Sequence, residues 1–184
     1  MYEPQEDSLM LSSVLKNFLS GKKLDLCIDM GCGSGIQGLL MSSFSKMVLF
    51  VDVNLDAVSY VSDLIKGKKN CLVVESNLFS NVDSNFKGRA DLIAFNPPYL
   101  PRESDESDDL ELTSGESGVD LTLKFLEDCV FFLKPSGKLF FVASSLSNID
   151  LLESKLSELK FKFRVCAREH IFFEDIFVYE AWRI

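Results

Sequence analysis

The sequence predicts an α/β fold: one mostly parallel sheet of seven strands, helices on both of its faces, and an antiparallel last strand. Three observations carry this prediction. Short apolar runs alternate with amphipathic stretches along most of the 184 residues. The first apolar run leads through a glycine-rich turn, Gly31-Cys32-Gly33-Ser34-Gly35, into a helical pattern. The fourth ends in Asn96-Pro97-Pro98-Tyr99, where two prolines stop the strand and leave Asn96 at the edge where open α/β sheets bind ligands.

The composition fits a single packed domain over residues 1–184. Hydrophobic residues make up 47% of the chain and Phe alone contributes 16. No apolar run approaches the ~20 residues of a membrane span, and the acidic N-terminus lacks the pattern of a signal peptide. We therefore expect a cytoplasmic protein without a membrane partner, with the nucleus as a second possible location. The net charge of −9 argues against direct binding of nucleic acid through its phosphates.

Cysteine and histidine usage limits the possible chemistry. The five cysteines are odd in number and form no Cys-x-x-Cys pair, so we expect reduced, mostly buried thiols, no disulfide framework and no zinc site. His170 is the single histidine. A histidine metal cluster, or a Ser-His-Asp triad centred elsewhere, is therefore excluded, and we expect no metal.

The first predicted helix covers residues 8–19, where apolar side chains recur at three- and four-residue spacing. Asp7 or Ser8 is the expected N-cap. Acidic residues are common at helix starts. Glu6 and Asp7 therefore have a structural explanation as well as the ligand-binding one given below.

The predicted first strand, at 24–30, runs through the glycine-rich turn into a helix at 36–44. Glycines let a backbone approach a ligand closely, and a helix N-terminus offers free N–H groups. The spacing is Gly-x-Gly-x-Gly, with Asp29 before it, and not the Gly-x-Gly-x-x-Gly of dinucleotide-binding folds. Such a turn also serves simply to connect a strand to a helix, so both interpretations stay open on this motif alone.

Two further strands end in polar side chains. Residues 47–51 lead to Asp52, about twenty residues beyond the glycines, where nucleoside-binding α/β folds place the acid that accepts both ribose hydroxyls. After a predicted helix at 55–65, residues 71–74 form a third strand that leads to Glu75-Ser76-Asn77. We expect the strand at 71–74 to form an edge of the sheet.

The alternation of predicted strands and helices continues after one interruption, at residues 101–118. Residues 101–118 carry a charge run without apolar periodicity, which predicts a solvated acidic loop, with room for a role in admitting substrate. The elements expected after it are a helix at 119–133, a turn at 134–137, a strand at 138–144, a helix at 149–159, an outer strand at 161–165 and a strand inside the sheet at 176–179. The last two patterns fit a final strand inserted antiparallel beside the fifth.

The order of these motifs resembles the class I S-adenosylmethionine-dependent methyltransferases, whose fold is Rossmann-like. Asn-Pro-Pro-Tyr marks members that methylate planar amino or amide nitrogens. With this tetrad, Tyr2-Glu3-Pro4-Gln5-Glu6-Asp7 and Ser114-Gly115-Glu116-Ser117-Gly118 resemble the eukaryotic and archaeal HemK-related release-factor glutamine methyltransferases. The resemblance covers nearly the whole chain. It implies an S-adenosyl-L-methionine-dependent enzyme that methylates N5 of the glutamine in the Gly-Gly-Gln loop of a class 1 peptide-chain release factor.

The resemblance also assigns cofactor-binding roles to matching positions, with the N-terminal segment of residues 1–20 covering the site. The positions concerned are Glu6, Asp7, Asp29, Gly31, Gly33, Gly35, Asp52, Asn77 and Asn96. Asp29 and the three glycines would hold the methionine part, helped by Glu6 or Asp7, and Asp52 would take the ribose hydroxyls. Asn77 stands where many relatives carry an acid facing the adenine amino group. Its amide oxygen still accepts that hydrogen bond, but without charge.

The tetrad would carry the chemistry, with Asn96, Pro97 and Tyr99 as catalytic residues. An amide nitrogen is a poor nucleophile because its lone pair is delocalised into the carbonyl. The Asn96 side-chain oxygen and the Pro97 backbone carbonyl would accept both N–H groups of a glutamine amide, aim its lone pair at the methyl group and stabilise the developing positive charge. Tyr99 would pack on the flat amide.

Two alternatives stay open. An adenine N6 methyltransferase of DNA or RNA would use the same tetrad, because an aniline-like amino group fits it. Such an enzyme needs phosphate contacts, and the net charge of −9 argues against them. A non-catalytic binding module with the methyltransferase fold is the second alternative. The presence of Asn96, Asp29 and Asp52 argues against that one.

A protein partner follows from the same resemblance: a small zinc-binding activator shared by several translation-related methyltransferases. The predicted edge strand at 71–74 is apolar, and an uncovered apolar edge is an aggregation hazard. We therefore expect the activator to pair with this strand and to extend the sheet.

Overall fold

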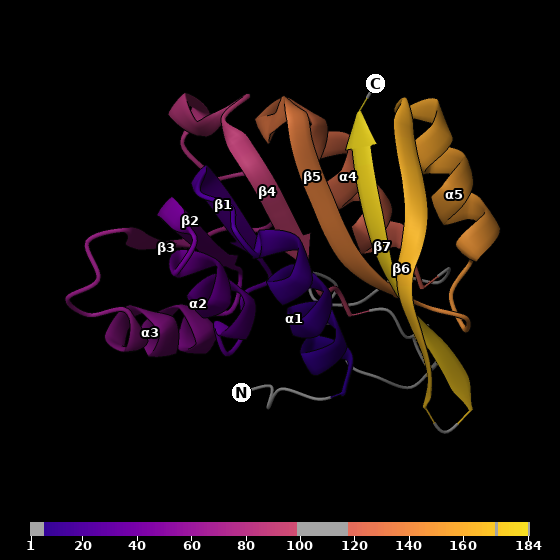
Figure 1. Ribbon diagram of the computed structural model, residues 1–184, viewed down its shortest axis with the longest axis horizontal. Helices are drawn as coiled ribbons and strands as arrows, with labels where there is room; N and C mark the ends of the chain where they lie inside the picture. Colours follow the sequence, from indigo (N-terminus) through magenta and orange to yellow (C-terminus); the bar gives the residue numbers. More distant parts are fainter. Residues whose placement is uncertain (1–5, 99–117, 172, 184) are drawn as a thin grey trace.

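A seven-stranded sheet with the order β3-β2-β1-β4-β5-β7-β6 forms the centre of the protein (Figure 1). The computed structural model describes residues 6–98, 118–171 and 173–183, so the predicted acidic loop up to residue 117 and Tyr99 lie outside the described part. The elements, in chain order, are α1 Glu6–Leu19, β1 Leu24–Met30, α2 Ile36–Ser42, β2 Ser45–Asp52, α3 Leu55–Leu64, β3 Cys71–Glu75, the short 3-10 helix η1 Ser84–Phe86, β4 Ala90–Phe95, α4 Asp120–Phe132, β5 Leu133–Ser144, α5 Ile149–Glu158, β6 Phe161–Ile171 and β7 Glu174–Arg183.

The strand pairing confirms the predicted fold class. Strands β3, β2, β1, β4 and β5 pair in parallel, whereas β7 pairs antiparallel with both β5 and β6. The last strand therefore lies inside the sheet beside the fifth, as predicted, and β6 is an outer strand. The predicted edge position of β3 is also confirmed. Within the described residues, no helix is long and apolar enough to cross a membrane.

Helices cover both faces of the sheet, so the sheet separates two apolar cores (Figure 1). The face with α1, α2 and α3 buries side chains such as Leu15, Phe50 and Val61. The opposite face, with α4 and α5, buries others such as Ile28 and Phe125. Neighbouring strand residues point to opposite faces, and both faces are apolar, which explains the continuous apolar runs in the sequence.

Helix α2 packs unusually close to β2, and a glycine makes this possible. A Cβ atom added at Gly38 would lie 2.1 Å from the ring of Phe50. Any side chain at this position would therefore push α2 off the sheet. The glycine requirement at residue 38 comes from packing alone, since Gly38 lacks the positive φ angle of the glycines in the preceding turn.

Helix α1 begins earlier than predicted. It starts at Glu6, so Asp7 and Ser8 lie in its first turn and neither is the N-cap. The first four N–H groups of a helix have no partner within the helix. Here the Asp7 carboxylate accepts a hydrogen bond from the Ser8 N–H, with an N–O distance of 2.6 Å. An acidic side chain inside the first turn thus satisfies one of the N–H groups that an N-cap side chain would otherwise satisfy.

Strand β5 also begins earlier, at Leu133, where the sequence predicts the end of a helix and a turn over residues 134–137. Ala90 pairs with Leu133 but Leu92 pairs with Lys138, so the intervening residues form a bulge in the ladder. A Cβ at Gly137 would lie 2.7 Å from the Leu133 side chain and 2.8 Å from the Ala90 carbonyl oxygen. The proline and glycine in this segment therefore mark a bulge, because the strand resumes pairing with β4.

The hairpin of β6 and β7 is longer than the predicted strands at 161–165 and 176–179. Its outer part is polar, and cross-strand contacts join its two strands. The Asp175 carboxylate accepts a hydrogen bond from Arg168 at 2.6 Å and lies 3.1 Å from His170 Nδ1. Since such residues carry no apolar periodicity, the sequence pattern does not reveal this part of the hairpin.

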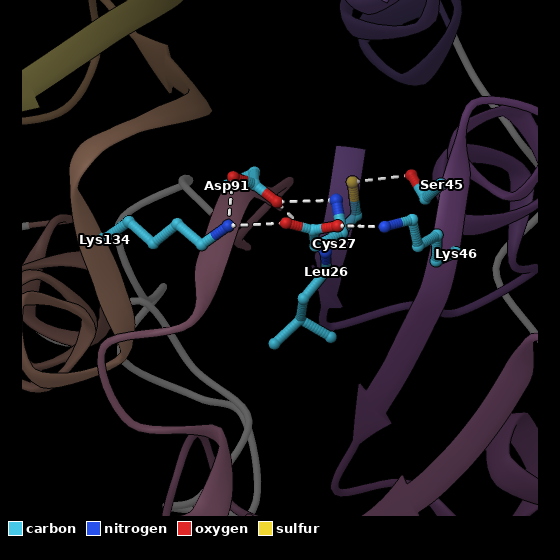
Figure 2. A network of polar contacts seen from close by, with 7 residues as sticks. Leu26, Cys27, Ser45, Lys46, Asp91 and Lys134 are labelled. Carbon is cyan, nitrogen blue, oxygen red and sulfur yellow. Dashed lines mark hydrogen bonds and ion pairs between the residues drawn. The ribbon is translucent and has the colours of Figure 1, made fainter. Parts of the chain in front are cut away.

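At the amino ends of the parallel strands, a cluster of polar contacts joins β1, β2, β4 and β5, as Figure 2 shows. Asp91 Oδ2 accepts hydrogen bonds from the N–H groups of Asp25 at 2.7 Å and Leu26 at 3.1 Å. Asp91 Oδ1 lies 2.6 Å from Lys134 Nζ. Lys134 and Lys46 both contact the Asp25 carboxylate, at 3.1 and 2.8 Å. This cluster lies at the sheet edge opposite to the one described next.

Candidate active site

The sequence-predicted site residues follow the carboxyl ends of the parallel strands. In Figure 1, β4 and β5 run toward the lower edge of the view, where the first turn of α1 also lies. Two backbone hydrogen bonds and one close approach of the backbone connect the segments there. The Cys32 N–H donates to the Val51 carbonyl at 3.0 Å, and the Ser76 N–H donates to the Asp52 carbonyl at 2.8 Å. A Cβ at Gly31 would lie 3.9 Å from the Asn96 carbonyl oxygen. The glycine turn, Asp52, Asn77 and Asn96 thus belong to one edge of the sheet.

The glycine turn adopts a backbone that glycine favours, and it leaves open space beside it. Gly31 has a φ angle of +58° and Gly33 one of +47°, both in the left-handed region. A Cβ at Gly31 would press on the Phe95 ring at 3.2 Å. A Cβ at Gly33 would meet nothing within 4 Å among the described residues. The turn therefore packs tightly against β4 on one side and borders open space at Gly33.

Asp52 holds this turn against the end of β2. Its Oδ2 accepts a hydrogen bond from the Gly33 N–H at 2.8 Å, and its Oδ1 accepts one from the Asn54 N–H at 2.9 Å. The carboxylate is only partly buried. Because each carboxylate oxygen accepts more than one hydrogen bond, Asp52 keeps acceptor capacity for hydroxyl groups of a ligand.

Asp29 has a different environment from Asp52. Its side chain is 2% exposed, and its Oδ2 accepts a hydrogen bond from the Gly38 N–H at 2.7 Å. Helix α2 has Gly35 as its N-cap, which has no side chain to cap with, and Asp29 supplies that acceptor from the neighbouring strand. Burial raises the pKa of Asp29 well above its ordinary value, and the negative charge of Asp52 raises it further. Its described contact is thus with α2, and its role toward a cofactor stays a prediction.

Asn77 and its neighbour Ser76 follow β3 directly. Ser76 is buried, and its Oγ accepts a hydrogen bond from the Asn81 N–H at 2.9 Å. Asn77 is partly buried, and its backbone carbonyl accepts one from the Ser80 N–H at 3.1 Å. Ser76 also contacts Asp52 through the backbone, so the Asn77 segment lies next to the predicted ribose-binding acid.

The two ends of the Asn96 side-chain amide have different surroundings. Its Nδ2 donates to Asp7 Oδ2 at 3.1 Å and lies 3.0 Å from Ser8 Oγ. Its Oδ1 is buried and has no hydrogen-bond partner among the described residues. Buried polar side-chain atoms are nearly always hydrogen-bonded, so an unpartnered acceptor at a sheet edge indicates a place where a ligand donates. Pro97, which follows, is buried.

Two residues that the sequence analysis did not select hold α1 in place. The buried Gln37 side chain donates from Nε2 to the Ser8 carbonyl at 2.7 Å. Its Oε1 accepts a hydrogen bond from Ser12 Oγ at 2.9 Å. Nothing in the local sequence marks these contacts, because the partners are 25 and 29 positions apart. Of the two predicted acids in this turn, Asp7 is buried in the site and Glu6 is exposed.

The site fits the nucleoside-bearing methyl donor that the sequence implies. The turn leaves open space beside Gly33, where a side chain would otherwise stand. The Asp52 carboxylate lies at that turn with acceptor capacity for two ribose hydroxyls. The open backbone, the acid and the buried acceptor of Asn96 are thus close to one another. The residues that would hold the donor are the turn glycines, Asp52 and Asn77.

Comparisons with known proteins agree with this geometry. The chain matches the methyltransferase small domain family over residues 7–172. A Methanocaldococcus jannaschii protein, provisionally named as a protein N5-glutamine methyltransferase, is 34% identical over 100% of this chain and 92% of its own length. Mouse methyltransferase HEMK2 is 26% identical over 80% of this chain and 73% of its own length.

A solved structure agrees with the fold. It is the E. cuniculi Mtq2–Trm112 complex, which is responsible for methylation of the translation termination factor eRF1. It matches with a TM-score of 0.77 at 20% identity, over 100% of this chain and 98% of the matched chain.

The family match covers most of the chain, and the archaeal relative is similar over all of it. Family membership implies S-adenosylmethionine as the methyl donor, in agreement with the site. The strand order and the antiparallel β7 are those expected of the class I methyltransferase fold. This chain is a class I S-adenosylmethionine-dependent methyltransferase that belongs to the methyltransferase small domain family.

Proposed function

We propose that this chain is a protein N5-glutamine methyltransferase whose substrate is the glutamine of the Gly-Gly-Gln loop in a class 1 release factor. The observation that carries the proposal is the Asn96 amide. Both of its contacts to described residues use Nδ2, which leaves the buried Oδ1 free to accept from a substrate. The provisional name of the archaeal relative and the eRF1 methylation ascribed to the Mtq2–Trm112 complex support the same choice of substrate.

In the proposed mechanism, the chain binds and orients a planar amide. Asn96 Oδ1 accepts one N–H of the substrate glutamine, and the Pro97 carbonyl accepts the other. Both acceptors stabilise the positive charge that develops on nitrogen during the reaction, and the prolines fix them in advance. S-adenosylmethionine, when bound, supplies an electrophilic methyl group. The methylated nitrogen then releases one of its two protons.

We also propose that a small zinc-binding activator pairs with the edge strand β3. Leu72 in this strand is 44% exposed, and Leu55, Tyr60 and Leu64 on α3 are exposed large apolar residues. The strand thus offers free backbone groups together with an apolar side chain, which is how extended segments are recognised at sheet edges. The Trm112 subunit of the Mtq2 complex supports this choice of partner. A cytoplasmic location, where release factors act, is part of the same proposal.

Methyl transfer from labelled S-adenosylmethionine to a class 1 release factor tests the substrate. The reaction is run with and without the activator, and the label is mapped by peptide mass spectrometry. We expect label on the Gly-Gly-Gln glutamine, and loss of that label with Asn96→Ala while cofactor affinity is nearly unchanged. Asn17→Ala, an exposed asparagine on α1, is the matched control and should retain activity.

Three outcomes would overturn parts of the proposal. Absence of label on the release factor with intact cofactor binding would refute the substrate, and adenine-containing nucleic acids would be tested next. Absence of cofactor binding would instead favour a non-catalytic module. Full activity of the isolated, soluble monomer would refute the activator.

A further inference from the structure

We propose that Asp7 is a positioning residue that fixes which end of the Asn96 amide faces the substrate. Ser8 holds the same amide without selecting its orientation, and Gln37 keeps both residues in place. The inference rests on the proposed role of Asn96 and adds the part of the molecule that makes this role possible. It gives α1 a function in catalysis beyond covering the cofactor site.

A side-chain amide has two orientations of nearly equal shape, which exchange its oxygen and its NH2 group. In the observed orientation, Asn96 Nδ2 lies 3.1 Å from Asp7 Oδ2 and 3.0 Å from Ser8 Oγ. In the rotated one, Asn96 Oδ1 would face the Asp7 carboxylate. An ionised carboxylate only accepts hydrogen bonds, so this contact would become repulsive.

The two partners contribute differently to the choice. The Ser8 hydroxyl accepts from an NH2 group or donates to an oxygen, so it stabilises either orientation. Asp7 accepts only, and it therefore selects the observed one. Loss of a charge-assisted hydrogen bond of ordinary strength disfavours the rotated amide by roughly tenfold or more.

The orientation decides whether the site binds an amide substrate. A substrate glutamine presents N–H donors, and Asn96 must meet them with an acceptor. The rotated Asn96 would present its own NH2 group to those donors, so the substrate nitrogen would lose both its orientation and the stabilisation of its developing charge. We therefore expect catalysis to follow the fraction of molecules with Oδ1 toward the substrate.

Gln37 keeps α1 at the required distance. Its side chain is 4% exposed and contacts α1 twice, at the Ser8 carbonyl and at Ser12 Oγ. Four apolar side chains of the same helix, Met10, Leu11, Leu15 and Leu19, are buried in the core on that face of the sheet. The polar contacts thus fix the first turn of a helix that packing already holds. Since Gln37 follows the glycine turn, α2 both borders the cofactor site and holds α1.

Steady-state kinetics at saturating cofactor test the proposal. Asp7→Asn should lower kcat for the glutamine substrate roughly twofold, because its amide group can accept from the observed Asn96 or donate to a rotated one, and about half of the molecules then present the wrong end. Ser8→Ala should change kcat less than Asp7→Asn does, because the Ser8 hydroxyl stabilises either orientation of Asn96. Gln37→Glu, which removes the donor to the Ser8 carbonyl, should also lower kcat. Ser13→Ala, at an exposed serine of the same helix, is the control and should match the unmodified enzyme.

Comparing the effect of each substitution on kcat with its effect on the cofactor Kd separates a positioning role from cofactor binding. If Asp7 served only to bind S-adenosylmethionine, Asp7→Asn would raise the cofactor Kd and leave kcat at saturation unchanged. That result would overturn the proposal, as would a loss of kcat in Ser8→Ala as large as the loss in Asp7→Asn.

A spectroscopic measurement makes the test independent of the substrate. The Asn96 side-chain NH2 signals are assigned in a ¹H–¹⁵N spectrum by their loss in Asn96→Ala. We expect Asp7→Asn and Ser8→Ala to shift them, and Ser13→Ala to leave them in place. Unshifted signals would refute the contacts even if the release factor is the substrate. If the release factor is not methylated but the signals shift, the proposed function fails and the positioning contacts stand.

Discussion

The Asp52 carboxylate and the Gly33 N–H are joined by a hydrogen bond of 2.8 Å between the end of β2 and the glycine turn. The Asp52 side chain thus stabilises the shape of the turn, and its carboxylate oxygens are also acceptors beside the open space at Gly33. Its second oxygen accepts from the Asn54 N–H at 2.9 Å, directly before α3. Any change at Asp52 should therefore affect the predicted cofactor site both directly and through the shape of the turn.

Asp52→Asn should weaken cofactor binding roughly ten- to hundredfold. One carboxylate oxygen becomes an NH2 group, which faces a backbone N–H that needs an acceptor, and the charge that we predict to face the ribose is lost. Calorimetric titration with S-adenosylmethionine measures the effect. Asp56→Asn, at an exposed position in the first turn of α3, is the control. An equal change in both variants would contradict the assignment.

Asp29→Asn should change how stability depends on pH. The pKa of Asp29 is raised by burial, so the folded chain keeps this proton at pH values where the unfolded chain has lost it. The free energy of unfolding therefore falls as the pH rises from the ordinary value of 3.8 toward the raised pKa. The asparagine cannot ionise and still accepts from the Gly38 N–H.

We expect the Tm of Asp29→Asn to exceed that of the unmodified protein by roughly 2–4 °C at neutral pH, with the difference shrinking toward acid. Thermal unfolding at a series of pH values measures this. Asp63→Asn, at an exposed position of α3, should show no such trend. A lower Tm for Asp29→Asn at neutral pH would mean that the ionised carboxylate stabilises the fold.

Asp91→Ala should destabilise the fold without affecting cofactor binding. It would remove the acceptor for the N–H groups of Asp25 and Leu26 and the partner of Lys134 (Figure 2). We expect a loss of about 1–3 kcal/mol in the free energy of unfolding, measured in urea. The cluster is at the amino edge of the sheet, so the cofactor Kd should stay the same. Asp25→Ala removes only exposed ion pairs and should have a much smaller effect.

Glu180→Gln should reduce stability at neutral pH but not in acid. Burial would raise the pKa of Glu180, but hydrogen bonds from Arg164 and Lys138 outweigh it and hold the pKa below its ordinary value of 4.5. The resulting stabilisation is fully present above pH 4.5 and is lost as the pH falls through the lower, folded pKa. We expect a difference of about 1–2 kcal/mol at pH 7 that disappears in acid unfolding experiments. A difference that persists in acid would contradict this account.

The sequence predicts the centre of the fold well, because buried parallel strands have an unmistakable pattern. Strand β1 has the predicted bounds, and the positions of β3 and β7 in the sheet are also confirmed. Errors occur where long-range contacts override local preference. The local sequence of residues 134–137 predicts a turn, but pairing with β4 makes these residues a bulge within β5. The outer part of the β6–β7 hairpin is polar and is held by ion pairs, which periodicity does not detect.

The places of the predicted site residues in the fold follow from the sequence, but their contacts do not. Strand ends and turn glycines mark the positions of Asp52 and Asn96, because topology brings carboxyl ends of parallel strands to one edge. The orientation of Asn96 depends on Asp7, 89 positions earlier, and on a helix that Gln37 holds. Asp29, expected as a ligand, is buried and contacts α2. Such pairings arise only when the helices pack on the sheet.

The insertion of β7 between β5 and β6 has a consequence for biosynthesis. As the chain leaves the ribosome, β6 emerges before the strand that must separate it from β5. The ladder beyond β5 therefore stays incomplete until residues 174–183 are available. The parallel ladders of strands β1 to β5 do not include this segment. Translation thus delivers the five parallel strands first, and the ladders of β7 with β5 and β6 can form only afterwards.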